Sequence, residues 1–206
     1  MNEELTIPPS RDEAAASLAE VDRVVAQTRH AIRQGISAPL LMLWGCIWIV
    51  ADVTTQFYPQ GAGWIWMLLD VIGILGWWLI FKFSGSNVKT PRGWRYGVFW
   101  GVLFFYATLW MNLLVPVAHW PQTAQQWADF WPMYRRMAAY MHTIPMFAYV
   151  IGGLWIDRFF IWLGVAVTAL IVFGLFYVDQ YFFLWLAATG GGSLVLAGVF
   201  IKKCWK

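Results

Sequence analysis

Six apolar stretches constrain this chain more than any other feature of its sequence, since a helix of about 20 residues crosses the ~30 Å hydrocarbon core of a bilayer. Hydrophobic residues make up 60% of the chain and charged residues 12%, whereas a soluble domain carries about 25% charged residues. The sequence therefore predicts an all-α, polytopic membrane bundle of six transmembrane helices. The predicted helices span residues 38–56, 62–83, 97–118, 138–156, 159–178 and 181–201.

The placement of lysine and arginine predicts the orientation of this bundle. If the N-terminus is cytoplasmic, twelve of the fourteen basic residues fall on the cytoplasmic side and only Arg135 and Arg136 fall outside. Short cytoplasmic loops are enriched in Lys and Arg, so we expect both termini in the cytoplasm. The twelve are Arg11, Arg23, Arg29, Arg33, Lys82, Lys89, Arg92, Arg95, Arg158, Lys202, Lys203 and Lys206.

The chain divides into residues 1–36, residues 37–201 and a basic tail at 202–206. Ser10 and Glu13 have the spacing of a capping box, which predicts a cytoplasmic amphipathic helix over residues 11–34. This helix either packs on the protein's own loops and the lipid surface, or docks a partner or a second copy. Its apolar stripe contains Leu18, Val21, Val25 and Ile32.

The longest predicted outer loop, residues 119–137, is rich in tryptophan and tyrosine. These side chains prefer the headgroup level of a membrane. We therefore predict a separate amphipathic helix lying in the outer interface between the third and fourth spans. A lid over an outer pocket is the functional alternative. Two short turns are expected at Asp157-Arg158 and at Asp179-Gln180.

Polar residues of the predicted spans gather in the outer half of the membrane. Ionisable residues are costly there and are functional candidates by default. We expect an outward-facing polar pocket for a ligand or ion, with the alternative that each residue makes a structural hydrogen bond between helices. The candidates are Asp52, Asp70, Asn112, His119 and His142.

Three consecutive glycines, Gly190, Gly191 and Gly192, lie near the middle of the sixth predicted span. Glycine is unfavourable inside a helix, so the run predicts either a helix break that lines a site or a close contact between helices.

Other chemistries find little support in the sequence. The spacing of the three histidines and two cysteines matches no metal or haem motif, and no hydrolase, nucleotide-binding or protease signature is present. A methionine stripe at Met133, Met137 and Met141 suits Cu(I) but also ordinary packing. We expect no cofactor, no metal and no nucleic-acid partner, and the sequence leans against enzymatic activity without deciding it.

These observations favour a multi-pass sensor or accessory subunit in the inner (plasma) membrane of a bacterium, with a cytoplasmic docking helix. Its cytoplasmic loops would attract anionic lipid headgroups. The first alternative is a small proton- or cation-coupled transporter that uses Asp70 and the glycine run. The second is a membrane enzyme that acts on lipid.

Overall fold

The structure is a computed structural model that describes residues 10–32, 38–83, 93–114, 121, 123–155 and 157–204. These residues form helices and connecting turns, with no strand among them. In chain order the helices are α1 (Arg11–Ile32), α2 (Ala38–Phe57), the short η2 (Pro59–Gly61), α3 (Ala62–Phe83), α4 (Gly93–Leu114), α5 (Ala124–Trp155), α6 (Arg158–Tyr177), α7 (Phe182–Leu186), η4 (Ala187–Gly191) and α8 (Gly192–Cys204).

Five of these helices are long and apolar enough to cross a membrane: α2, α3, α5, α6 and the continuous α7–η4–α8 helix. Within the described part of α4, the apolar stretch is shorter and covers Val98–Leu113. Many large apolar side chains lie on the outer surface of the bundle, as is expected when lipid is the solvent. The predicted all-helical class is confirmed, and five helices have the length and hydropathy of a membrane span.

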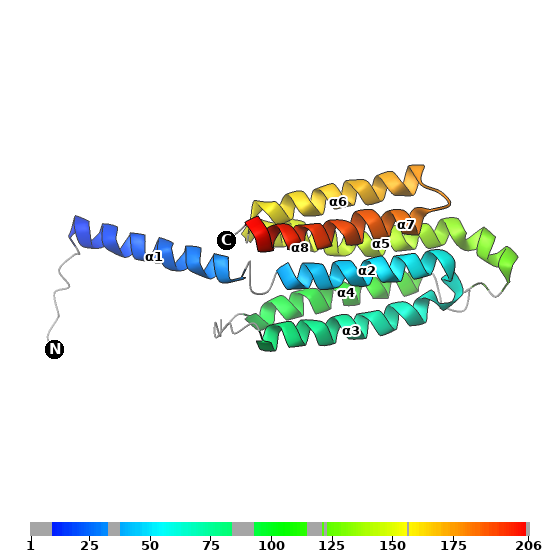
Figure 1. The fold of residues 1–206 in the computed structure, drawn as a ribbon, viewed down its shortest axis with the longest axis horizontal. Helices are drawn as coiled ribbons and strands as arrows, with labels where there is room; N and C mark the ends of the chain where they lie inside the picture. Colours follow the sequence, from blue (N-terminus) through cyan, green and yellow to red (C-terminus); the bar gives the residue numbers. More distant parts are fainter. Residues whose placement is uncertain are drawn as a thin grey trace.

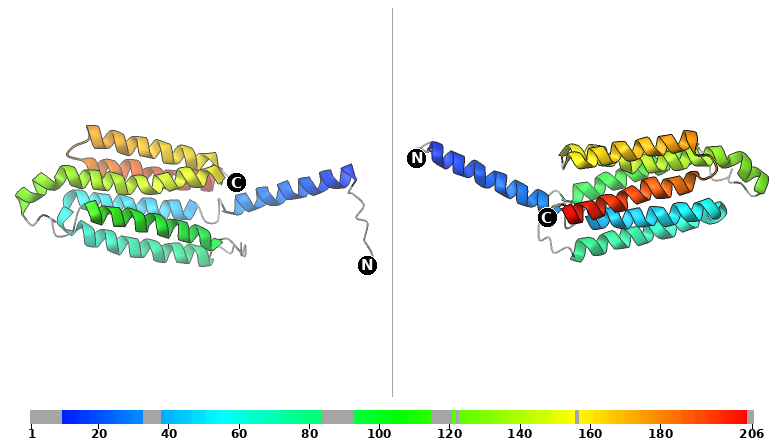
Figure 2. Two further views of the ribbon diagram at one scale, coloured as in Figure 1. Left: turned by 180° about the vertical axis from the view of Figure 1, so that it is seen from behind. Right: turned by 45° about the horizontal axis from the view of Figure 1, so that its top comes forward.

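The helices of the bundle lie alongside one another, and the chain runs back and forth along its length (Figure 1). The start of α2 and the end of α8 lie at one end of the bundle, whereas the turn between α6 and α7 lies at the other. Helix α1 extends beyond the first end in every view (Figure 2). This arrangement leaves α1 separate from the apolar bundle.

The capping box predicted at the start of α1 is confirmed. The Ser10 amide donates to Oε2 of Glu13 at 2.9 Å, and the Glu13 amide lies 3.3 Å from Oγ of Ser10. Leu18 and Val21 of the predicted apolar stripe are exposed. Val25 and Ile32 lie outside the residues whose side chains the structure describes.

Small residues bring α2 and the last helix into close contact. A Cβ atom on Gly191 would lie 2.8 Å from the carbonyl oxygen of Gly45, and one on Gly198 would lie 2.7 Å from that of Ala38. Each helix therefore presents two small residues seven positions apart, and the two pairs face each other. Gly191 of the glycine run thus lies at a close contact between α2 and the last helix.

The predicted separate helix in the outer interface is wrong. Residues from Ala124 onward belong to α5, one helix of 32 residues that continues through the predicted fourth span. Pro132 and Pro145 both lie inside it. Membrane helices tolerate proline where neighbouring groups satisfy the freed carbonyls, so these residues did not separate two elements.

The helix that contains the third predicted span begins four residues earlier than expected. Helix α4 begins at Gly93 and is described as far as Leu114, whereas residues 97–118 were expected. The predicted residues beyond Leu114 lie outside the described part of the chain.

Both turns predicted near the membrane surface are present. Asp157 caps α6, because its side chain accepts a hydrogen bond from the Phe159 amide at 2.8 Å. At the other end of α6, Arg135 donates to the carbonyl oxygen of Leu175 at 2.7 Å and forms an ion pair with Asp179. Gln56 donates to the carbonyl oxygen of Gln180 at 2.9 Å. The turn is thereby attached to both α2 and α5.

Candidate functional site

Asp52 of α2 and His142 of α5 form a buried pair in the bundle. Nε2 of His142 lies 3.0 Å from Oδ2 of Asp52. The side chains are 3% exposed for His142 and 0% exposed for Asp52, so the pair is closed to both water and lipid. A buried carboxylate next to an imidazole is costly unless the two share a proton, and this requirement defines the chemistry of the site.

The hydrogen bonds of His142 fix where its first proton lies. Nδ1 lies 2.8 Å from the carbonyl oxygen of Ala138, which can only accept, so Nδ1 carries a proton and donates it. The contact between Nε2 and Oδ2 then needs one further proton, held by either atom. The pair is therefore an imidazolium with a carboxylate, or a neutral imidazole with a carboxylic acid, and moving one proton converts the two.

Aromatic rings enclose the imidazole. The rings of Trp48 and Trp66 lie edge-on to it, with centroids 4.5 Å and 5.7 Å away. The indole N–H of Trp66 donates to Oγ1 of Thr55 at 3.2 Å, and the Thr55 hydroxyl donates to the Ala51 carbonyl at 2.7 Å. Tyr134 of α5 is buried and interacts with Thr55 as well. These contacts hold Trp66 against the pair and connect α3 and α5 to α2.

The second carboxylate oxygen of Asp52 is unusual. Oδ1 is buried and has no hydrogen-bond partner among the described residues. Buried polar atoms are nearly always paired, and an exception in a functional protein calls for a reason. The buried pair therefore leaves one carboxylate acceptor unsatisfied within the described part of the chain.

A π-helical turn passes next to the imidazole. Ala187–Gly191 form this turn within the last helix, so the predicted helix break takes the form of a local widening and the helix continues into α8. A Cβ atom on Gly190 would lie 3.2 Å from the Trp48 ring and 3.8 Å from Cδ2 of His142. π-Turns are frequent at functional sites, and this one lies against the buried pair.

The remaining candidates from the sequence lie apart from the pair. Asp70 is exposed on α3, and Asn112 is exposed on α4, where its Nδ2 donates to the Thr108 carbonyl at 2.8 Å. His119 lies outside the described residues. The structure thus brings together Asp52 and His142 from the predicted set and adds Trp48, Thr55, Trp66 and Tyr134, which the sequence did not single out.

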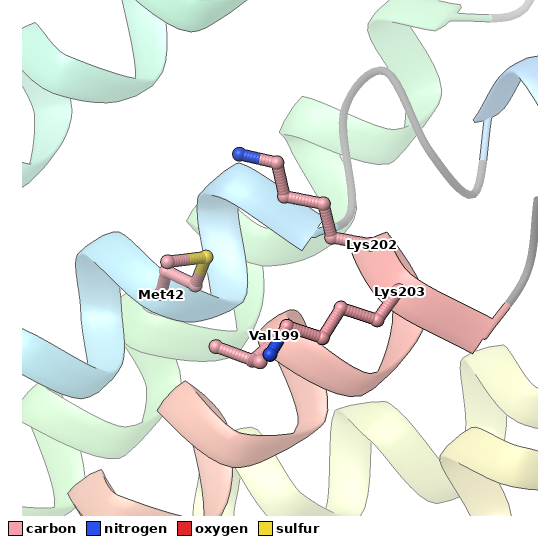
Figure 3. Close-up of a pocket in the computed structure, with 4 residues that line it drawn as sticks. All are labelled: Met42, Val199, Lys202 and Lys203. Atoms are coloured by element: carbon pink, nitrogen blue, oxygen red, sulfur yellow. The ribbon is translucent and has the colours of Figure 1, made fainter.

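A shallow hollow lies at the end of the bundle where the chain finishes (Figure 3). Met42, Val199, Lys202 and Lys203 line it, and both lysine side chains are exposed. Apolar side chains next to two ammonium groups fit the boundary between acyl chains and anionic headgroups. Among the described residues, no three His, Cys, Asp or Glu side chains gather closely enough to hold a metal ion.

The fold and the site define a helical membrane protein with a buried carboxylate–imidazole pair. No family model, curated protein or solved structure matches this chain. Its function is therefore argued from the geometry of the pair and of the helices around it.

Proposed function

We propose that this protein is a multi-pass membrane sensor or accessory subunit, in which the Asp52–His142 pair couples the packing of the bundle to the cytoplasmic helix α1. The observation that carries the proposal is the closed pair itself, 0% and 3% exposed, with one shared proton and an unpaired Oδ1. A transport site has to exchange its ion with water on each side. A closed pair suits a switch better, because its state changes when the surrounding helices move.

The proposed orientation has six spans and both termini in the cytoplasm. Five helices meet the length and hydropathy of a span, and α4 would be the sixth. The distribution of basic residues supports this orientation, because Arg11, Arg23 and the lysines at the end of α8 would share the cytoplasmic side. An even number of spans also agrees with the position of the start of α2 and the end of α8 at one end of the bundle (Figure 1).

A line of buried contacts leads from the pair toward α1. Along α2, the side facing the last helix contains Asp52 and then, toward the N-terminus, a series of buried residues. The series is Trp48, Gly45, Leu41 and Ala38. Gly45 closely approaches Gly191, and Ala38 closely approaches Gly198. A shift of α2 at Asp52 would therefore be transmitted to Ala38, where α2 begins.

A proton-coupled transporter is the second candidate, and the π-turn favours it. The turn lies beside His142 and could rearrange to open a path to the shared proton. The role given to Asp70 in the transport hypothesis would then fall to Asp52, since Asp70 lies apart on the exposed surface of α3.

One experiment separates the two candidates. The variant Asp52→Asn replaces the shared proton by a fixed amide hydrogen, since an asparagine N–H can donate to Nε2. A nitroxide at position 18, attached to a Leu18→Cys variant without Cys46 and Cys204, reports the motion of α1. For a switch, Asp52→Asn should alter its spectrum in liposomes, while proton flux into the same liposomes stays at the background level.

The control is Asp129→Asn, the same chemical change at an exposed site of α5. It should leave both readouts as in the parent protein. Proton flux that requires Asp52 would replace the sensor proposal with transport. An unchanged spectrum together with background flux would show that the pair only stabilises the fold.

A further inference from the structure

Asp70 lies in an unusual place, on the outer surface of the apolar helix α3. Counting from Ala62, it is about 12 Å along the helix and thus close to the middle of the span. Its side chain is exposed, and the described residues give it no hydrogen bond or ion pair. Carboxyl groups at this depth normally face the interior of a bundle and pair with another group. The isolated protein leaves this one facing lipid.

The surface around Asp70 has the character of an uncovered contact face. Met67, Ile74 and Trp77 lie three, four and seven positions from it, on the same side of α3, and are exposed. One turn beyond Met67, a Cβ atom on Gly63 would meet nothing within 4 Å. Helix α3 packs on α2 through Gly73 and Gly76, and it runs along the edge of the bundle (Figure 1). A further helix therefore has room to lie on the Asp70 side.

Charge complementarity identifies what would cover this face. In the described part of the bundle, the basic residues lie at or near helix ends, apart from Arg135 and Arg136 within α5, and Lys82 lies about 18 Å along α3 from Asp70. Arg135 already binds the turn between α6 and α7. A second copy of this chain would thus place another carboxyl group or apolar side chains at the depth of Asp70, and neither would neutralise its charge. A helix of another protein could bring a basic one.

We propose that the face of α3 around Asp70, formed with Gly63, Met67, Ile74 and Trp77, docks a transmembrane helix that carries a lysine or arginine at the depth of Asp70. The proposal rests on the proposed function, since it names the kind of partner that an accessory subunit would have. Trp66 connects the proposed docking face to the buried Asp52–His142 pair. It lies one turn before Asp70, and its ring lies edge-on to His142.

The test uses the full chain and a designed helix in liposomes. The probe is a peptide of about 20 leucines and alanines with one lysine at the ninth position, about 12 Å from its outer end. Energy transfer is measured between a dye on Cys204, in a Cys46→Ser variant, and a dye on the peptide. One control peptide has glutamine in place of lysine, and another has its lysine four positions deeper, about 6 Å away.

The matched lysine peptide should bind at least about tenfold more tightly than either control peptide. Asp70→Asn should abolish that difference, whereas Asp70→Glu should retain it and Asp129→Asn should leave it unchanged. The three peptides are compared on the protein that retains Asp70, so this comparison remains valid even if a substitution at position 70 disturbs folding.

Three results would overturn the proposal: equal binding of all peptides, a preference that persists in Asp70→Asn, or energy transfer between two protein copies that requires Asp70. The last result would assign the face to self-association. Failure of the docking test leaves the response of α1 to Asp52→Asn intact, and failure of that response leaves peptide binding intact, so the two proposals fail separately.

Discussion

Nε2 of His142 lies 3.0 Å from Oδ2 of Asp52, although 90 positions separate the two residues in the chain. The hydrogen bond from Nδ1 to Ala138 leaves Nε2 able to accept when His142 is neutral. Asp52→Asn can satisfy Nε2 and should lower the free energy of unfolding by less than about 1 kcal/mol. Asp52→Leu leaves Nε2 buried and unpaired, which should cost about 1–3 kcal/mol.

Unfolding in mixed micelles, followed by helical circular dichroism as the fraction of denaturing detergent rises, would measure both changes. His142→Phe in the Asp52→Leu background should recover part of the loss, because no polar atom of the pair then remains unpaired. Equal stability of Asp52→Asn and Asp52→Leu would show that Nε2 finds another partner.

The close contact between α2 and the last helix predicts a sharp difference between two glycines. A Cβ atom on Gly191 would lie 2.8 Å from a backbone oxygen and 2.9 Å from the Ile49 amide nitrogen, and neither atom can move independently of its helix. Gly191→Ala should therefore cost about 1–3 kcal/mol. At Gly152 a Cβ atom meets nothing within 4 Å, so Gly152→Ala should be neutral or stabilise by up to about 1 kcal/mol. The same unfolding measurement compares the two variants.

Much of the helical framework was predictable because local chemistry sets helix ends. The structure places α3 over Ala62–Phe83, as predicted, and ends α2 at Phe57, one residue beyond the prediction. The charged residues at Asp157 and Asp179 marked turns because neither would be buried alone in lipid. The predicted division between residues 119–137 and the fourth span was wrong, because α5 continues from Ala124 to Trp155 through both.

The site was less predictable, because pairing is a property of the packed bundle. Asp52 and His142 were both candidates, but His142 was expected at the outer end of a span. Its helix begins earlier, at Ala124, so His142 lies about 27 Å along it. The aromatic rings around the imidazole come from α2 and α3, and no spacing in the sequence identifies them. The requirement that two ionisable groups at similar depth pair could have suggested the contact.

Arg135 should matter more to the turn between α6 and α7 than its ion-pair partner does. Its guanidinium donates to the Leu175 carbonyl at 2.7 Å and lies 5.3 Å from the centre of the Phe182 ring. The Asp179 side chain is 88% exposed, and exposed ion pairs contribute less than about 1 kcal/mol. Asp179→Asn should therefore change amide hydrogen exchange in residues 175–181 only slightly, whereas Arg135→Gln should accelerate it several-fold. Similar acceleration in both variants would assign the dominant role to the ion pair.

The first turn of α1 should lose stability in acid through Glu13. The Ser10 amide and hydroxyl hydrogen-bond the Glu13 carboxylate, and these contacts hold the pKa of Glu13 below its usual value of 4.5. Because the pKa is lower in the helix than in the unfolded segment, the stabilisation is complete above the unfolded pKa and disappears as the pH falls through the folded pKa. Glu13→Gln keeps a hydrogen-bond acceptor but removes the titration.

Amide exchange of residues 12–14 would test this, compared between the parent protein and Glu13→Gln at each pH so that the intrinsic dependence of exchange on pH cancels. Exchange in the parent protein should be slower than in Glu13→Gln at pH 6, and the two should converge below the folded pKa. Ser10→Ala should lose protection at both pH values, because it removes the acceptor of the Glu13 amide hydrogen bond. A constant ratio across this pH range would mean that the carboxylate does not contribute to the cap.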